Sequence, residues 1–101
     1  MNDRELLEMA AKATGVSIWF DDQGRKWTER LGRSWNPLTD DGDALRLAVD
    51  LNIGFRNMGH IMTAAGSGGQ FNEYADGDAY AATRRAIVRA AAEIQRGKER
   101  K

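Results

Sequence analysis

The sequence predicts an α+β fold: one domain over residues 1–101, in the order α-β-β-α-β-β-α, with a small antiparallel sheet and helices packed on one of its faces. Three segments repeat their apolar residues with the helical period of 3.6, whereas short segments between them are rich in β-branched and aromatic residues. A length of 101 residues suits a single domain, and 42% apolar with 30% charged residues is typical of globular chains. Because cysteine is absent, disulfides, thiolate metal sites and cysteine nucleophiles are excluded.

The first helix is expected over residues 3–14. Asn2 or Asp3 can cap its start, and Gly15 is placed to end it in the left-handed conformation. Its apolar side chains share one face, at Leu6, Leu7, Ala10, Ala11 and Thr14.

A hairpin is expected next. Residues 16–20 and 25–31 read as its strands, and 21–24 as the turn between them. Trp19 and Trp27 flank the turn at similar distances, so they could pair across the strands. Residues 32–38 read as a connector.

A second helix is predicted over 44–51, with Thr39 to Asp43 supplying its cap and first turn. The segment Asp-Gly-Asp-Ala occurs at 41–44 and again at 76–79, and the capping preference of aspartate explains this more simply than an internal duplication. The predicted packing face of this helix, the one expected to be most buried, carries Leu45, Ala48 and Val49, widened by Leu47 and Leu51.

The third part of the chain contains strands near 53–57 and 60–65, a glycine-rich loop at 66–69 and a short alternating strand at 70–74. The last helix is expected over 79–96. Gly97 should stop it and leave 97–101 as a frayed basic tail. Its packing stripe is predicted at Tyr80, Thr83, Ile87, Ala90, Ala91 and Ile94.

Two groups of residues are candidates for catalysis or ligand binding. Asp40, Asp41 and Asp43 could bind a divalent cation and, with His60, serve a small nuclease or phosphodiesterase, but helix capping accounts for these carboxylates more simply. The glycines of 66–69 could cradle a phosphate, yet neither a lysine nor a helix start follows them. We therefore expect no enzyme, no metal site and no cofactor.

Charge is unevenly distributed although the chain is neutral overall. Residues 84–101 hold seven basic and two acidic side chains, a net charge of +5, so the remainder carries −5. Arginines in such a segment can recognise phosphate or nucleic acid, whereas an acidic remainder would repel the backbone of a nucleic acid. Trp35 either packs in the core or offers an exposed aromatic platform.

Two blocks, residues 35–49 (WNPLTDDGDALRLAV) and 78–92 (DAYAATRRAIVRAAA), resemble a group of small proteins encoded by tailed phages and prophages; residues 2–13 fit the same group. The resemblance covers about 40 residues and supplies no functional residue. Residues 53–75 have no counterpart in it, and a recognition surface could differ there.

The resemblance implies a phage accessory protein in the host cytoplasm that inhibits a bacterial defence system, in the manner of an anti-CRISPR, by stoichiometric binding to a host protein. A sponge for a nucleotide immune signal and a small nucleic-acid-binding factor are the alternatives, and a homodimer is compatible with each. No membrane partner is expected, because no apolar run approaches the roughly 20 residues that span a bilayer. The binding residues are predicted to be Trp35, His60, Tyr80, Arg84 and Arg85.

Overall fold

The chain folds into helices and strands that alternate along the sequence. The computed structural model describes residues 2–16, 18–20, 26–28 and 33–100, and the side chains of 2–16 and 35–100. The elements in chain order are α1 (Asp3–Thr14), β1 (Ile18–Phe20), β2 (Lys26–Thr28), β3 (Arg33–Ser34), α2 (Asp41–Asp50), β4 (Gly54–Asn57), β5 (Ile61–Gly66), β6 (Gly69–Tyr74) and α3 (Ala79–Glu99). This confirms the α+β class.

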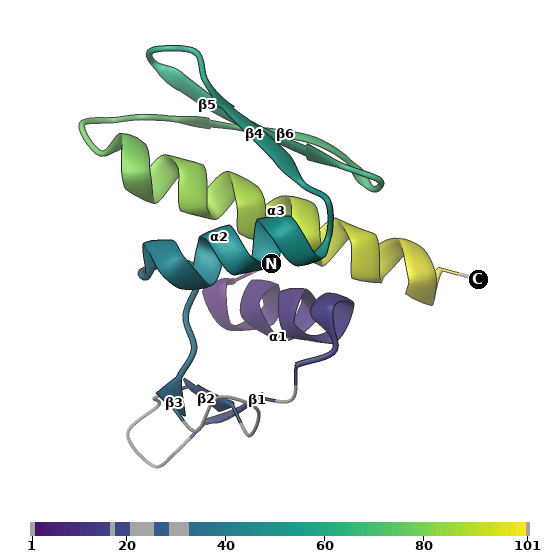
Figure 1. The fold of residues 1–101 in the computed structure, drawn as a ribbon. Coiled ribbons are helices and arrows are strands. Elements are labelled where there is room, and N and C mark those ends of the chain that lie inside the picture. Colours follow the sequence, from purple (N-terminus) through teal and green to yellow (C-terminus); the bar gives the residue numbers. More distant parts are fainter. Residues whose placement is uncertain (1, 17, 21–25, 29–32, 101) are drawn as a thin grey trace.

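Helix α3 lies at the centre of the fold. Strands β4–β6 cover one side of it, and α1 and α2 pack on the other side (Figure 1). Because α3 is covered from two sides, its buried positions spread over much of its circumference, and small alanines allow the close approach. Its buried residues are Ala82, Ala86, Ile87, Val88, Ala90, Ala91 and Ala92.

The sheet on α3 is antiparallel, in the order β4-β5-β6. Across it, Ala64 of the central strand lies between Phe55 and Phe71, and these three residues share the face that meets α3. Ala64 and Met62 are buried there, so β5 is the strand that contributes most to the core. Strand β4 forms one edge of the sheet, and all of its residues are exposed.

The helix ends follow the expected capping chemistry. The side chain of Asn2 accepts a hydrogen bond from the Glu5 amide at 2.8 Å, and Gly15 adopts a φ of 75° after the last turn of α1. Asn52 likewise follows α2 with a φ of 55°. The roles predicted for Asn2 and Gly15 at the ends of α1 are confirmed.

The repeated Asp-Gly-Asp-Ala segment takes two different structures. At 41–44 it is the first turn of α2, capped by Asp40, whose carboxylate accepts from the Asp43 amide at 2.8 Å. At 76–79 it is mostly a left-handed turn before α3, with Asp76 and Gly77 at positive φ and Asp78 as the cap. This difference agrees with capping preference and gives no support to a duplication.

Several expectations about the fold are corrected. The described strands form two three-stranded sheets, whereas the predicted order has one sheet and two strands in each half; the third strand of the second half, β6, is the short strand that was expected over 70–74. The extra strand of the first half, β3, lies inside the expected connector and pairs with β2, while the β1–β2 register does place Trp19 opposite Trp27. The predicted turn at 21–24 lies outside the described residues.

The last helix passes through Gly97 and ends at Glu99, so 97–99 are helical and not a frayed tail. A glycine inside a helix costs about 1 kcal/mol relative to alanine. Side chains of the final turns offset that cost: Arg100 bonds Glu93 at 2.7 Å, and Gln95 bonds Glu99 at 2.9 Å. Lys101 lies outside the described residues.

The glycine-rich segment 66–69 is a tight turn between β5 and β6, with Gly66 paired to Gly69. A Cβ on Gly68 would come within 3.0 Å of the Ile94 backbone nitrogen, so glycine lets this turn sit directly on α3. The turn is followed by a strand, which removes the context that a phosphate cradle requires. None of the helices in the described residues has the length and apolarity to cross a membrane.

Candidate protein-binding groove

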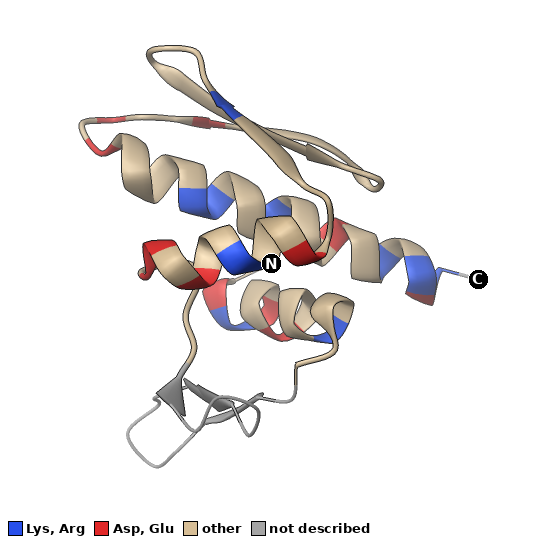
Figure 2. Ribbon diagram, in the orientation of Figure 1, with Lys and Arg blue, Asp and Glu red and all other residues tan. Residues whose placement is uncertain are grey.

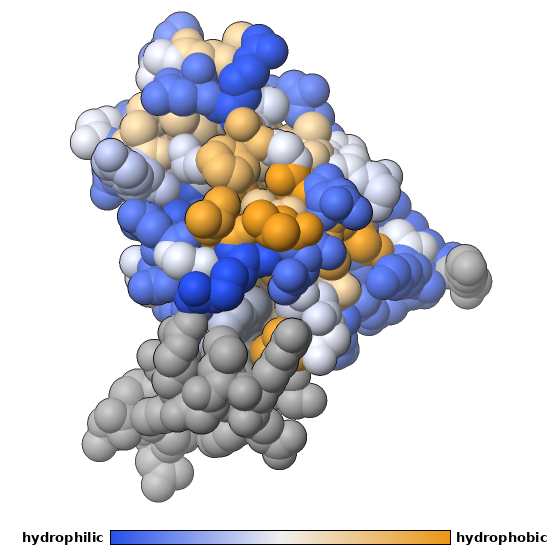
Figure 3. All heavy atoms as spheres, in the orientation of Figure 1, coloured by the Kyte–Doolittle hydropathy of each residue, from blue (hydrophilic) through white to orange (hydrophobic). Residues whose placement is uncertain are grey.

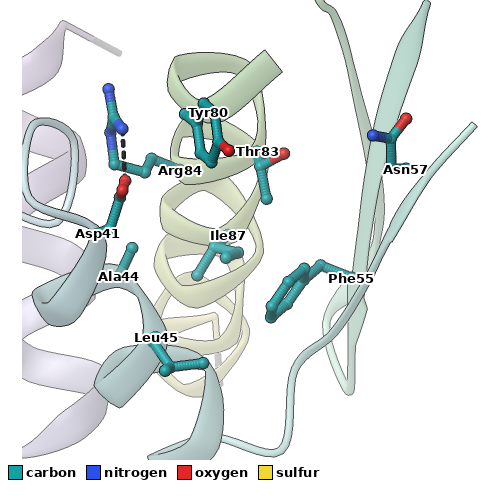
Figure 4. Close-up of a pocket in the computed structure, with 9 residues that line it drawn as sticks. All are labelled: Asp41, Ala44, Leu45, Phe55, Asn57, Tyr80, Thr83, Arg84 and Ile87. Carbon is teal, nitrogen blue, oxygen red and sulfur yellow. Dashed lines mark hydrogen bonds and ion pairs between the residues drawn. The ribbon is translucent and has the colours of Figure 1, made fainter. Parts of the chain in front are cut away.

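A hollow lies beside α3, between α2 and the edge strand β4 (Figure 4). Its volume is about 390 Å³. We call it the apolar groove and define it by its lining residues: Asp41, Ala44, Leu45, Phe55, Asn57, Tyr80, Thr83, Arg84 and Ile87. The floor is supplied by α3, and the two walls come from segments that are separated in the sequence.

The lining of the groove exposes large apolar side chains. Leu45 is 53% exposed, Phe55 is 48% exposed and Tyr80 is 73% exposed. Figure 3 shows a hydrophobic patch on the face where α2 approaches the sheet. Contiguous apolar surface of this kind marks interaction sites, whereas single exposed apolar residues need no explanation.

The groove exists because the apolar face of α2 is wider than the surface it packs against. The sequence placed Leu45 and Val49 on the buried face, and this prediction is wrong. Leu47 and Ala48 are buried as predicted, and Asp43 and Ala44 are buried beside them, which turns Leu45 toward the groove and leaves Val49 in solvent. Helix α3 contributes more buried residues than α1 or α2, so the expectation that α2 is the most buried helix is wrong.

One end of the groove is polar and rigidly held. Arg84 donates to the Asp41 carboxylate at 2.6 Å and to the Leu38 carbonyl at 2.8 Å, and its side chain is only 16% exposed. The guanidinium therefore joins α3 to the start of α2 and to the loop before it. An arginine with these partners shapes the groove more than it offers a free charge to a ligand.

The loop that Arg84 contacts is fixed by a buried carboxylate. Asp43 is 1% exposed and accepts hydrogen bonds from the Asn36 amide at 2.9 Å and from Arg46 at 2.8 Å. A buried carboxylate is tolerated when its oxygens are bonded in this way. Asp43 is thus a structural residue that holds the loop leading into α2.

The three carboxylates of the acidic cluster have different structural roles. Asp40 caps α2, Asp41 pairs with Arg84, and Asp43 accepts a hydrogen bond from the Asn36 amide of the preceding loop. Among the described residues no group of histidine and carboxylate side chains could hold a metal ion. His60 lies in the turn between β4 and β5, whereas these carboxylates lie at the start of α2.

The five predicted binding residues are distributed over the molecule. Tyr80 and Arg84 meet in the apolar groove, whereas Arg85 lines the opposite flank of α3 and pairs with Asp3 at 2.9 Å. His60 is exposed in the turn between β4 and β5. Trp35 is 4% exposed in the core, which is its packing role and not an exposed platform.

The basic segment at the end of the chain is largely neutralised by the fold. Figure 2 shows basic residues spaced along α3 and acidic residues at the starts of α1 and α2. Carboxylates pair with the described arginines of this segment: Asp41 with Arg84, Asp3 with Arg85, Glu73 with Arg89, and Glu93 with both Arg96 and Arg100. The net charge of +5 therefore does not form a free cationic surface of the kind that binds a phosphate backbone.

Sequence reasoning missed Leu45 and Phe55 as site residues, because both were counted as apolar members of packed elements. A signal was present for Leu45. Helix α2 carries six apolar residues in the eight positions 44–51, more than one packing face requires.

Comparisons of the chain with protein-family models, curated protein sequences and solved structures found no match.

Proposed function

We propose that this chain is a binding protein that acts by binding another protein at the apolar groove and so covering part of that protein's surface. The observation that carries the proposal is the half-exposure of Leu45 and Phe55 around a preformed hollow on two packed elements. Apolar anchors held on rigid elements lose little conformational entropy on binding, which is what a recognition site requires.

The specific role that we propose is that of a phage-encoded inhibitor of a bacterial defence protein, acting stoichiometrically in the host cytoplasm. The support is the resemblance of residues 35–49 and 78–92 to small phage proteins. Those two blocks meet at the groove, since one supplies Leu45 and the other Tyr80 and Ile87. The remaining wall, with Phe55 and Asn57, comes from residues 53–75, which the resemblance does not cover.

A protein partner is favoured over a nucleotide or a nucleic acid. Apart from Arg56, the described arginine side chains are engaged with carboxylates, and Arg84 at the groove is bonded twice within the chain. Burial of an apolar patch contributes about 25 cal/mol per Å² whatever the charge of the partner. The groove therefore offers more binding free energy to apolar side chains than to phosphates.

The test is a matched pair of variants on α2. Leu45→Glu places a charge in the groove wall, while Val49→Glu places the same charge on the same helix outside the groove. Both side chains are mostly exposed, so both variants should keep the thermal midpoint of the parent. The assay is the plating efficiency of a phage on bacterial strains that carry defined defence systems and express the chain.

We expect the parent and Val49→Glu to restore plating on at least one strain, and Leu45→Glu to lose that effect. The defence protein isolated from that strain should bind the parent at a stoichiometric ratio, with affinity reduced about a hundredfold by Leu45→Glu, as for an interface hot spot. Restoration that survives Leu45→Glu would remove the groove from the proposal. Absence of restoration in all strains would remove the anti-defence role.

A further inference from the structure

We propose that the apolar groove receives an extended segment of the partner, which adds to β4 as a new edge strand and carries an acidic side chain between two apolar ones. This deepens the proposed function and rests on it. Three observations on β4 carry the inference: its outward backbone groups, the hollows on both of its faces, and the charge of Arg56.

The backbone of β4 has hydrogen-bonding groups that face away from the sheet. The Met58 amide donates to the Ile61 carbonyl at 2.9 Å and closes the turn to β5. Because such bonded pairs alternate along an antiparallel ladder, Arg56 also faces β5, whereas the amides and carbonyls of Phe55 and Asn57 face outward. No described residue bonds these outward groups, so they are available to an added strand.

Both faces of the sheet are hollowed beside this edge. The apolar groove lies on the inner face, next to the side chains of Phe55 and Asn57. A second hollow of about 480 Å³ borders the outer face, lined by Gly54, Phe55, Arg56, Met58, Thr63, Ala65 and Gln70. Side chains of a strand point alternately to the two faces, so one strand beside β4 would fill both hollows.

The outer hollow selects a negative charge. Arg56 contacts the Met58 sulfur at 3.7 Å, and it is the arginine without a carboxylate within ion-pair distance among the described side chains. On an added strand, the residue directly opposite Arg56 shares its face, and its neighbours point into the apolar groove. A partner segment that complements this edge therefore has an acidic residue between two apolar ones.

A second copy of the chain fits this edge poorly. A two-fold pairing of β4 with itself that bonds Phe55 of one copy to Asn57 of the other would set the two Arg56 side chains directly opposite each other. Like charges in that position destabilise a sheet. A helix in the groove, for its part, would leave the outward groups of β4 without partners.

The first experiment selects short randomised peptides on the immobilised full chain and measures the affinity of the enriched sequences. Asn57→Pro removes an amide that β5 does not use, and Asn57→Ala is its matched control because both lose the side-chain bond to Gly59. We expect peptides with an acidic residue between apolar ones, bound about five- to tenfold more weakly by Asn57→Pro than by Asn57→Ala, the equivalent of one hydrogen bond. In Arg56→Glu, lysine should replace the acidic residue among the enriched sequences.

The second experiment needs no variant. Amide hydrogen exchange is measured for the parent alone and with the selected peptide bound. The amides of Phe55 and Asn57 should exchange fast in the free chain and slow at least tenfold in the complex, while Arg56, already bonded to β5, should be protected in both states.

The outcomes separate this inference from the proposed function. Peptides that bind as helices, or that are lost on Leu45→Glu but unaffected by Asn57→Pro, would overturn strand addition and leave the groove as a binding site. Peptides insensitive to both changes would overturn both proposals. Failure to enrich any peptide, or a concentration-dependent dimer abolished by Asn57→Pro, would overturn the extended partner segment.

Discussion

Phe55 and Phe71 occupy equivalent positions on the two sides of Ala64, on the same face of the sheet, but their surroundings differ. Phe71 packs against the core, and the Arg89 guanidinium lies 5.0 Å from the centre of its ring. Arg89 also pairs with Glu73, so this flank of α3 is covered by side chains of the chain itself. Phe55 has no such cover, since Arg84 on its side of α3 is directed to Asp41 and Leu38.

The comparison indicates that the exposure of Phe55 is specific to one flank and does not follow from the small size of the sheet. Helix α3 packs against both β5 and β6 and makes few contacts with β4, and on the side of β6 an arginine adds to the cover of Phe71. On the side of β4 an apolar side chain remains exposed, so the free energy that its burial would contribute is gained only when a partner covers it. The following predictions test this difference, beginning with the largest effect.

Ile87→Ala should lower the free energy of unfolding by about 3 kcal/mol, because Ile87 belongs to the core as well as to the groove floor. Chemical denaturation of the parent and variant measures it. A change below about 1 kcal/mol would mean that the floor is loosely packed, and the groove would then not be preformed.

Phe71→Ala should cost about 2 kcal/mol, while Phe55→Ala at the equivalent position should cost well under 1 kcal/mol. The costs differ because Phe71 packs against the hydrophobic core, whereas Phe55 is not among the residues packed against it. The same denaturation experiment gives both values, and each variant is the control for the other. Equal costs would contradict the difference between the two flanks.

The pair of Arg89 and Glu73 should show a coupling free energy of about 1 kcal/mol in a double-mutant cycle with alanine, reduced at high salt. Both side chains are partly exposed, which limits the value. The cycle is measured by denaturation at low and high ionic strength. A coupling free energy near zero would mean that Arg89 covers Phe71 through its contact with the ring and gains nothing from Glu73.

Arg85→Ala should have the smallest effect, below about 0.5 kcal/mol, because its ion pair with Asp3 is exposed at the surface. The variant should also retain partner binding, since Arg85 lies on the flank away from the groove. Isothermal titration against the partner checks this. A clear loss of affinity would move the interface to the flank of Phe71.

The helices, their caps and the class of the fold could be predicted from the sequence, because these depend on contacts within a few residues. Asn2, Gly15, Asn52 and Asp78 act at the positions that their backbone preferences indicate. Strand β3 could not be predicted, since a strand this short is defined by its pairing with β2 rather than by its own pattern.

The site was predictable only in part. Tyr80 and Arg84 were selected for residue type, and the fold brings both to the groove. Leu45 and Phe55 were not selected, because the burial of an apolar residue depends on what lies across from it in the fold. Trp35 shows the reverse case, since tryptophan is common at interfaces but this one is buried in the core.

The glycine turn between β5 and β6 has a mechanical consequence. Gly68 rests on the backbone of Glu93 and Ile94, which fixes one corner of the sheet to α3. The β4–β5 turn is tied to the end of β6 instead, since the His60 carbonyl accepts a hydrogen bond from the Ala75 amide at 2.9 Å. Because β4 makes few contacts with α3, a load applied to the molecule should move this edge of the sheet before it moves the corner at Gly68.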